Sequence, residues 1–163
     1  MKNKHKALFL DRDGVINFDP GDYTTSVEEF DILPTVIDAL VIAKEKGYKI
    51  IIITNQGGLA KGLYTLDEVH KIHDKLRAAC SVQNVQIDGI YFSPHHPDFG
   101  NSLTRKPGSL LMERAIALHD IDTEKSTMIG DRERDVQCAE KVGVKGILIP
   151  TNGALIEYVT TLP

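Results

Sequence analysis

An apolar segment at residues 7–10 runs directly into Asp11-Arg12-Asp13-Gly14, so two carboxylates stand one residue apart. In an extended segment, residues i and i+2 point to the same side, which brings Asp11 and Asp13 together where a buried strand would end. Two carboxylates that close repel each other, so a proton or a cation must lie between them, and such oxygen ligands suit Mg²⁺. Asp and Gly also favour turns, and these four residues alone are equally typical of a simple turn.

Three further groups of polar residues follow later apolar segments. They are Thr54-Asn55 after the β-branched segment 48–53, Arg105-Lys106 beyond the segment 87–92 and its loop, and Asp131 with Asp135 after the segment 126–130. A cation held by the carboxylates, together with Lys106, would neutralise phosphate oxygens, while hydroxyl and amide donors would orient them. The set therefore indicates a site for a phosphate group.

The candidate nucleophile at this site is a carboxylate. Apart from Ser93, no serine or cysteine stands at a predicted strand end with an obvious base partner, so a serine triad is not supported. A carboxylate can attack phosphorus and form an acyl-phosphate. With two carboxylates in one short motif, the second could give a proton to the leaving alcohol and later take one from water.

The elements that must position these residues alternate along the chain. Besides 7–10, strands are predicted at 48–53, 87–92, 126–130 and 147–149, and helices at 34–46, 65–81, 107–118, 136–142 and 154–160. Strands alternating with helices favour right-handed βαβ units. We therefore expect one α/β domain over residues 1–163, a three-layer Rossmann-like parallel sheet with helices on both faces. Ligands of such sheets bind outside the carboxyl ends of the strands, where all four polar groups fall.

Other residues are given structural interpretations. The polar stretch 17–29 is too long for a tight turn, and we expect a loop over the mouth of the site. His70 and His73 are expected as polar surface residues beside the apolar stripe of their helix rather than as a metal pair. Cys80 and Cys138 fall within helical patterns and are expected to be buried free thiols in a reducing cytoplasm.

Composition limits the classes of function. The chain has a formal net charge of −4, and 42% of its residues are hydrophobic, which is ordinary for a soluble globular protein. The acidic balance argues against nucleic-acid binding through a broad basic surface. The apolar segment 7–10 is too short for a signal peptide or a membrane span. We expect a cytoplasmic monomer that acts on a small molecule, with no nucleic-acid or membrane partner.

The four polar groups together resemble the motifs of haloacid-dehalogenase-type (HAD) phosphatases. The matching residues are Asp11-Arg12-Asp13-Gly14, Thr54-Asn55-Gln56, Arg105-Lys106-Pro107 and Gly130-Asp131-Arg132-x-x-Asp135, in the order of the family and over nearly the whole chain. The short connections leave no room for a cap domain, so the resemblance is to the capless branch. It implies a HAD-like fold and a Mg²⁺-dependent phosphatase of a small phosphorylated metabolite.

The resemblance also implies roles for the acidic residues. Asp11 would be the nucleophile and a magnesium ligand. Asp13 would be the general acid/base and would bind the metal through its main-chain carbonyl. Asp131 would complete the magnesium site, with Asp135 as a nearby support.

The remaining residues of the motifs are expected around the phosphate and the substrate. Thr54 and Lys106 would hold the transferring phosphoryl group, and Asn55 is expected beside it. Arg105 would contact the substrate, and Arg132 is expected as a charge at the rim on the substrate side.

One loop departs from the pattern of the family. Many members of this branch hold a structural zinc with Cys-x-His and a later Cys-x-Cys, and the corresponding positions here are Ser93, His95, Ser102 and Thr104. Structural zinc sites use thiolate and imidazole ligands. The sequence therefore predicts no structural zinc, and a loop ordered by packing and hydrogen bonds.

The sequence leaves the substrate open. The segments 57–62 and 95–97 lean toward enzymes of the branch that act on D-glycero-D-manno-heptose 1,7-bisphosphate, whereas the segment 130–140 reads at least as much like those that act on histidinol phosphate. Two other classes of function are compatible with part of the pattern: a receiver-like signalling domain that accepts phosphate on an aspartate, and a catalytically silent binding protein. The second acidic group and the intact motifs argue against both.

Overall fold

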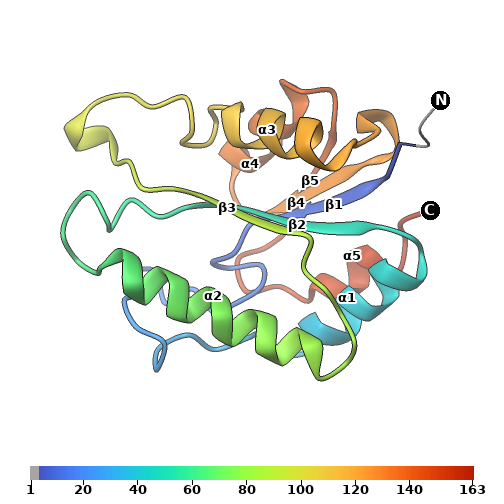
Figure 1. The fold of residues 1–163 in the computed structure, drawn as a ribbon, viewed down its shortest axis with the longest axis horizontal. Helices are drawn as coiled ribbons and strands as arrows, with labels where there is room; N and C mark the ends of the chain where they lie inside the picture. The colour runs from blue at the N-terminus through green and yellow to red at the C-terminus, as the bar shows by residue number, and fades with distance from the viewer. Residues whose placement is uncertain (1–3) are drawn as a thin grey trace.

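Five parallel strands form one sheet in this computed structural model, which describes residues 4–163 (Figure 1). The strands are β1 (Ala7–Leu10), β2 (Lys49–Asn55), β3 (Gly89–Ser93), β4 (Thr127–Gly130) and β5 (Lys145–Leu148). Their order across the sheet is β3-β2-β1-β4-β5, and every neighbouring pair is parallel. The predicted α/β class with a Rossmann-like parallel sheet is confirmed.

The central strand β1 is where the direction of winding reverses. The chain passes from β1 outward to β2 and β3, then returns to the other side of β1 for β4 and β5. Leu10, the last residue of β1, pairs with Ile52 on one side and Ile129 on the other. Such a reversal opens a crevice at the carboxyl ends of the strands. Asp11 follows Leu10 directly and therefore stands at this crevice.

Helices cover both faces of the sheet (Figure 1). On one face lie α1 (Val36–Glu45), α2 (Leu66–Ser81) and α5 (Leu155–Val159); on the other lie α3 (Leu110–His119) and α4 (Glu133–Glu140). Side chains alternate along β1, so Leu8 and Leu10 enter the apolar core under the first group, while Phe9 enters the core under the second. Each core also holds one buried free thiol, Cys80 or Cys138, as predicted.

Most element ends follow the local signals in the sequence. Thr65 and Glu68 form a capping box before α2: the Glu68 N–H donates to Thr65 Oγ1 at 3.3 Å and the Thr65 N–H donates to Glu68 Oε2 at 2.7 Å. Gly47 follows α1 with a φ of +84°, a conformation that glycine adopts at little cost.

Several predicted boundaries shift by two or three residues; α4, for example, begins at Glu133 rather than 136, and β3 at Gly89 rather than 87. Two of the shifts have a clear local cause. Pro107 does not open α3, which begins at Leu110, because the Gly108 N–H donates to the carbonyl of Arg105 and closes a separate turn first. The last strand starts at Lys145, two residues before the predicted apolar segment, because its pairing with β4 begins where Lys145 lies opposite Thr127. Within residues 4–163, no helix is both long enough and apolar enough to cross a membrane.

Candidate active site

A buried lysine lies between two carboxylates at the carboxyl end of β1. Nζ of Lys106 is 2.8 Å from Oδ1 of Asp11 and 2.7 Å from Oδ1 of Asp135, and it donates to the carbonyl of Ile53 at 2.6 Å. None of the three charged side chains is more than 8% exposed. The ammonium group thus joins the ends of β1 and β2 to the start of α4, and three of the predicted motifs meet at one point.

Burial sets the protonation of this cluster. It raises the pKa of Asp11 to about 7, because Lys106 offsets only part of the cost of desolvation and Asp135 adds a second negative charge. Burial would lower the pKa of Lys106, but Asp11 and Asp135 outweigh it and raise that pKa, so the lysine stays charged. A further cation beside Asp11 would favour the ionised carboxylate that a nucleophile needs.

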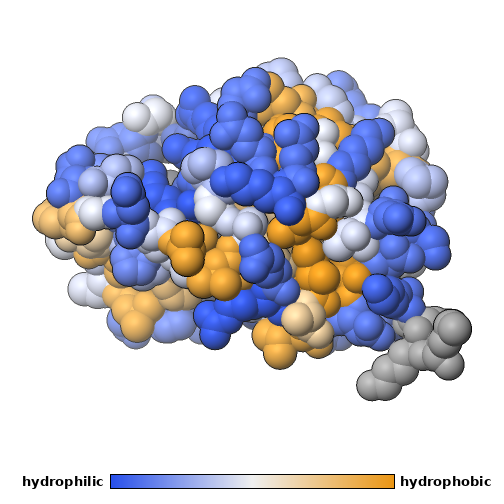
Figure 2. Space-filling model, turned by 90° about the horizontal axis from the view of Figure 1, so that it is seen from above, coloured by the Kyte–Doolittle hydropathy of each residue, from blue (hydrophilic) through white to orange (hydrophobic). Residues whose placement is uncertain are grey.

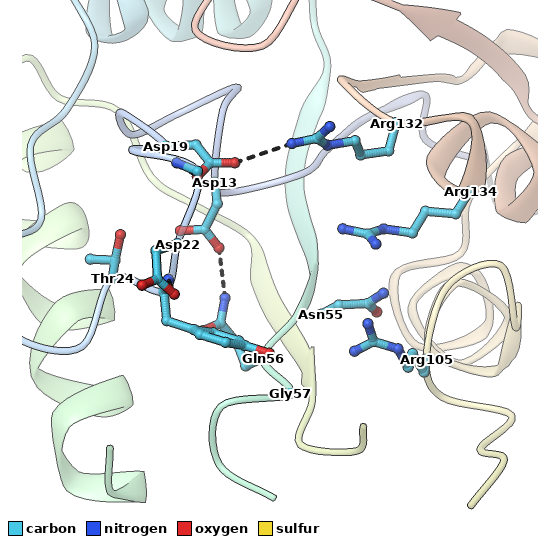
Figure 3. A pocket seen from close by; sticks show the side chains of 12 residues that line it. Asp13, Asp19, Asp22, Thr24, Asn55, Gln56, Gly57, Arg105, Arg132 and Arg134 are labelled. Carbon is cyan, nitrogen blue, oxygen red and sulfur yellow. Dashed lines mark hydrogen bonds and ion pairs between the residues drawn. The ribbon is translucent and has the colours of Figure 1, made fainter. Parts of the chain in front are cut away.

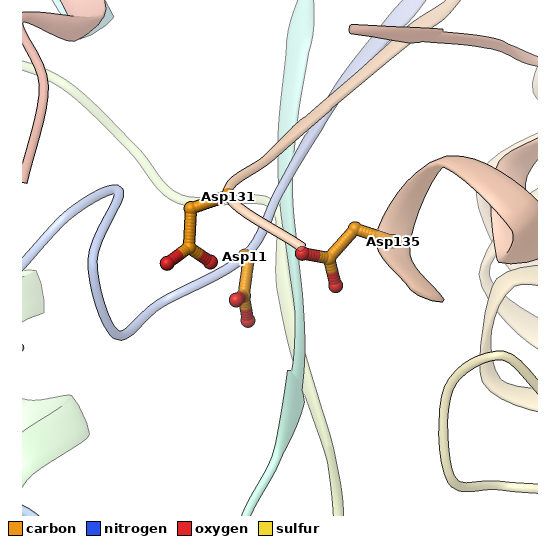
Figure 4. Close-up of side chains that lie close together, drawn as sticks. All are labelled: Asp11, Asp131 and Asp135. Carbon is orange, nitrogen blue, oxygen red and sulfur yellow. The ribbon is translucent and has the colours of Figure 1, made fainter. Parts of the chain in front are cut away.

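The residues around Asp11 fit such a cation. Carboxylate oxygens of Asp11, Asp131 and Asp135 lie within 4.8 Å of one another, and Asp11 lies between the other two (Figure 4). Oδ1 of Asp131 is buried and has no hydrogen-bond partner in the part of the chain described. Asp135 is already engaged, by Lys106 and by the N–H of Arg132 at 3.1 Å. Hard carboxylate oxygens are the ligands that Mg²⁺ prefers.

Gly14 lets the Asp11–Gly14 loop pass close to Asp131. Its φ is +83°, and a Cβ at this position would lie 2.5 Å from Oδ2 of Asp131. The same oxygen accepts a hydrogen bond from Thr151 Oγ1 at 2.6 Å. One oxygen of Asp131 is therefore fixed by the protein, which leaves the other to face Asp11.

Asp13 is held by three side chains. Its Oδ1 accepts hydrogen bonds from Arg12 and Asn17, each at 3.0 Å, and its Oδ2 accepts one from Gln56 at 2.9 Å. Burial would raise the pKa of Asp13, but the charge of Arg12 and these donors outweigh it and hold the pKa below its usual range. The carboxylate is 26% exposed. It is therefore ionised, fixed in orientation and open to the pocket.

His73 is not the surface residue predicted from the sequence. Only 6% of it is exposed, and its Nε2 lies 3.3 Å from a guanidinium nitrogen of Arg12. Burial, together with the positive charge of Arg12, lowers the pKa of His73 to about 3, so the ring is neutral. Arg12 is itself buried and therefore needs an acceptor, which the neutral imidazole supplies. His73 thus supports the arginine that holds Asp13.

Thr54 and Asn55 lie at the end of β2, opposite Asp11. Thr54 is fully buried, and its Oγ1 accepts a hydrogen bond from Gln56 at 2.9 Å. The Asn55 side chain bonds the main chain of Lys106 twice, donating to its carbonyl at 3.1 Å and accepting from its N–H at 2.9 Å. Asn55 therefore fixes the Lys106 loop to β2, and it also lines the pocket.

A pocket of about 310 Å³ opens beside this cluster (Figure 3). Its lining is Asp13, Asp19, Gly21, Asp22, Tyr23, Thr24, Asn55, Gln56, Gly57, Arg105, Arg132 and Arg134. The acidic side chains stand on one side of the view and the arginines on the other. Residues of the 17–29 loop supply much of the acidic side, so the loop lies at the mouth as predicted.

Two predicted substrate residues lie at this pocket. Arg105 lines it and donates from its guanidinium to the carbonyl of His95 at 3.0 Å. Arg132 is half exposed and lies 3.5 Å from Oδ2 of Asp19 and 3.4 Å from Oδ2 of Asp131. Arg132 therefore connects the loop at the mouth to the candidate metal site.

Hydroxyl groups gather where the zinc-binding loop of the family would lie. Thr104 Oγ1 is 2.9 Å from Ser93 Oγ and 2.8 Å from Ser102 Oγ, and the Thr104 N–H donates to Ser102 Oγ at 3.2 Å. These bonds tie the end of β3 to the segment before Lys106. Hydrogen bonds are therefore present in this loop, and that they order it stays a prediction.

Comparison with known proteins identifies the family. A family model described as HAD-hydrolase-like matches residues 103–157. The D-glycero-D-manno-heptose-1,7-bisphosphate 7-phosphatase of Chlorobaculum tepidum is 38% identical over 157 residues, which cover 90% of this chain and 79% of that protein. The corresponding β-anomer enzyme of Helicobacter pylori is 40% identical over 148 residues, 90% of this chain and 84% of that protein. The chain belongs to the HAD-like phosphatases.

A solved structure supports the assignment of this chain to the HAD-like phosphatases. The D,D-heptose 1,7-bisphosphate phosphatase of B. bronchiseptica, crystallised with magnesium and phosphate, superposes with a TM-score of 0.84 at 32% identity. The match covers 97% of this chain and 88% of the other. The predictions of the HAD family, the fold and a phosphatase activity are confirmed.

Sequence reasoning missed four supporting residues of this phosphatase. Gln56 bridges Asp13 and Thr54, and Tyr64 OH donates to its Oε1 at 2.8 Å. Thr151 orients Asp131, and His73 supports Arg12. Gln56 is the last residue of the Thr54-Asn55-Gln56 motif, so its position was a usable signal. Tyr64, Thr151 and His73 lie in ordinary helical or loop patterns, which gave no signal.

Proposed function

We propose that this phosphatase removes the 7-phosphate of D-glycero-D-manno-heptose 1,7-bisphosphate. The observation that carries the proposal is the buried Asp11–Lys106 pair at the end of β1, beside a pocket with an arginine-rich side. The names of the relatives and of the matched solved structure support this substrate. A carboxylate paired with a lysine suits phosphoryl transfer, and cationic side chains suit a substrate with two phosphates.

In this proposal Asp11 is the nucleophile. Its carboxylate attacks phosphorus of the 7-phosphate, the bond from phosphorus to the sugar oxygen breaks, and an aspartyl-phosphate forms. Before this step Asp13 takes up a proton from water, which the negative charge of the bound phosphate favours, and it then gives that proton to the leaving sugar oxygen. Asp13 then takes a proton from a water molecule as that water attacks phosphorus, which releases inorganic phosphate and restores Asp11. The ionised, hydrogen-bonded Asp13 seen here is the form that accepts this proton.

Magnesium would be held by Asp11, the main-chain carbonyl of Asp13, and Asp131, with Asp135 supporting through Lys106. When bound, the ion would neutralise charge on the phosphoryl oxygens and keep Asp11 ionised. The unpartnered Oδ1 of Asp131 is the observation that supports this assignment. We propose no structural zinc, because hydroxyl groups occupy the loop where thiolates would be required.

The remaining roles concern the phosphate and the substrate. Lys106 and Thr54 hold the transferring phosphoryl group, and Asn55 keeps Lys106 in place. Arg105 and Arg132 contact the substrate from the basic side of the pocket. That side suits the second phosphate of a sugar bisphosphate, whereas Asp19 and Asp22 on the other side would attract the ammonium group of histidinol phosphate. The choice of the sugar bisphosphate therefore rests on the names of the relatives. We further propose that the enzyme is a cytoplasmic monomer without nucleic-acid or membrane partners.

Phosphate release in the presence of Mg²⁺ tests the proposal. Heptose 1,7-bisphosphate and histidinol phosphate are compared on the wild-type enzyme, with Asp11→Asn as the control. We expect kcat/KM at least a hundredfold higher for the heptose, which corresponds to about 3 kcal/mol of differential transition-state binding, and no turnover by the variant. A reversed preference would overturn the substrate assignment. Rates unaffected by Asp11→Asn would overturn the mechanism.

A further inference from the structure

Arg134 is a pocket residue that the family motifs do not assign. It lies at the start of α4, and its side chain extends into the pocket beside that of Arg105 (Figure 3). It is the second of the two positions that the motif Gly130-Asp131-Arg132-x-x-Asp135 leaves unspecified. In the sequence, Arg134 stands among the charged residues 132–135 and resembles an ordinary surface residue. In the structure it is exposed, yet it lines the pocket.

The buried ion pair of the active site fixes where these two arginines lie. Lys106 and Asp135 are 2.7 Å apart. Arg105 precedes the first of them and Arg134 precedes the second, and neighbouring Cα atoms are about 3.8 Å apart along the chain. The pair that fixes Lys106 beside the nucleophile therefore also holds the loop of Arg105 against the helix start of Arg134.

The two guanidinium groups converge without a carboxylate between them. Among residues 4–163, no carboxylate lies within 4.0 Å of a side-chain nitrogen of Arg105 or Arg134, whereas Arg132 is near both Asp19 and Asp131. Partial burial and the charge of Arg134 lower the pKa of Arg105, which agrees with their proximity. Two cations directed into one pocket are stabilised by an anion bound between them.

We propose that Arg134, together with Arg105, binds the phosphate of the substrate that is not hydrolysed. This inference rests on the proposed function, because it takes the substrate to be a bisphosphate. Guanidinium groups bind phosphate oxygens through paired hydrogen bonds, which suits a terminal phosphate better than a hydroxyl. Arg134 is then a specificity residue: it selects sugars that carry a second phosphate over sugars that carry one.

The test compares two substrates on one set of variants. The substrates are D-glycero-D-manno-heptose 1,7-bisphosphate and the same sugar phosphorylated only at position 7. For Arg134→Gln we expect the ratio of their kcat/KM values to fall at least tenfold, through a higher KM for the bisphosphate with little change in its kcat. Arg134→Lys keeps the charge but loses the paired geometry, and we expect an intermediate ratio.

Arg114→Gln is the matched control, because Arg114 is exposed on α3 and does not line the pocket. It should leave the ratio at the wild-type value. If Arg134→Gln also leaves the ratio unchanged, or lowers both kcat/KM values equally, the inference on Arg134 is wrong while the proposed function stands. If the wild-type enzyme hydrolyses neither sugar, the proposed function fails, and this inference fails with it.

Discussion

One ammonium group balances two buried carboxylates beside the pocket. Lys106 is within 2.8 Å of both Asp11 and Asp135, and none of the three has more than slight contact with solvent. In such a cluster each partner compensates for the burial of the others, so removing one leaves uncompensated charge in a medium of low polarity. The same lysine is proposed to meet the phosphoryl group, and its loss therefore affects stability and catalysis together.

Lys106→Met should show both effects. We expect the free energy of unfolding without metal to fall by about 3–5 kcal/mol and kcat/KM to fall by about a thousandfold or more, which is about 4 kcal/mol of lost transition-state stabilisation. Mg²⁺ should restore part of the stability, because it replaces positive charge beside Asp11. Urea unfolding and phosphate release measure the two effects.

Lys141→Met is the comparison for this variant, since Lys141 is exposed and donates only to the carbonyl of Pro107 nearby. We expect a change within about 0.5 kcal/mol, as for most surface substitutions. A Lys106 variant that behaved like the Lys141 variant would remove the basis for the proposed site.

His73 supplies a prediction about pH. The folded protein protonates this ring only near pH 3, whereas the unfolded chain does so near its ordinary value of 6.5. The unfolded state therefore binds more protons between these values, and stability is lost as pH falls below 6.5. From pH 6.0 to 4.5 the loss from His73 is about 2 kcal/mol, because the unfolded ring is mostly protonated there and each pH unit contributes up to about 1.36 kcal/mol.

His73→Gln keeps a hydrogen-bond acceptor for Arg12 but does not titrate. We expect wild type to lose about 2 kcal/mol relative to this variant over that interval, as measured by urea unfolding at each pH. Asp11 contributes with the opposite sign, since its folded pKa is raised to about 7, but it does so in both proteins. Parallel stability curves for the two proteins would mean that His73 is not buried as a neutral ring.

At the scale of elements, the loop between β3 and α3 carries Arg105 and Lys106 into the site. Thr104 holds this loop through hydrogen bonds with Ser93 and Ser102. Thr104 lies two residues before Lys106, and Ser93 is the last residue of β3. The bond between them therefore ties the segment before Lys106 to the sheet. The position of the lysine therefore depends on hydroxyl groups outside the pocket.

Thr104→Val removes these hydroxyl contacts at almost constant volume. We expect a loss of about 1–2 kcal/mol in unfolding free energy, as for partly buried hydrogen bonds that lose one partner, with faster proteolysis of the 94–104 segment. Thr104→Ser, which keeps the hydroxyl group, should stay close to wild type. Equal stability of the Val and Ser variants would show that the hydroxyl contacts do not order the loop.

Because we propose no structural zinc in this loop, we can also predict how the enzyme responds to metal removal. EDTA should abolish phosphate release, and Mg²⁺ alone should restore it fully, because the loop needs no second metal in our proposal. Metal analysis of the purified protein, with activity measured after each addition, checks this. A requirement for Zn²⁺ to regain full activity would contradict the proposal.

At the scale of the whole molecule, two apolar cores share the strands of a single sheet. One core lies under α1, α2 and α5, and the other under α3 and α4, with alternate residues of β1 in each. If the strands separate on one face of the sheet, the core on the other face is exposed as well. The protein should therefore unfold as one unit.

Calorimetry tests this prediction of a single domain. We expect one transition in which the calorimetric and van't Hoff enthalpies agree. The midpoint should rise when Mg²⁺ and inorganic phosphate are added, because both would bind only the folded state. Two resolved transitions would show that the halves of the sheet fold separately.

The sequence predicted the molecule best where the signals are local or periodic. The strand β1, the capping box at Thr65 and the convergence of polar residues at strand ends all follow from short patterns. The start of α3 was mispredicted because a turn at Gly108 competes with the helix signal of Pro107. His73 was mispredicted because its burial depends on Arg12, which is 61 residues away in the chain. Contacts between residues so far apart in the chain produce no periodic pattern in the sequence.

The hydroxyl cluster around Thr104 also has a consequence for chemistry outside catalysis. Serine and threonine do not take part in the thiol oxidation that converts cysteine to sulfenic acid or disulfide. The two cysteines of the chain, Cys80 and Cys138, are buried in the cores, and burial raises the pKa of each to about 11, which keeps them as unreactive thiols. We therefore expect the loop between β3 and α3 to stay intact in the presence of peroxide, where a loop held by thiolates would lose its metal.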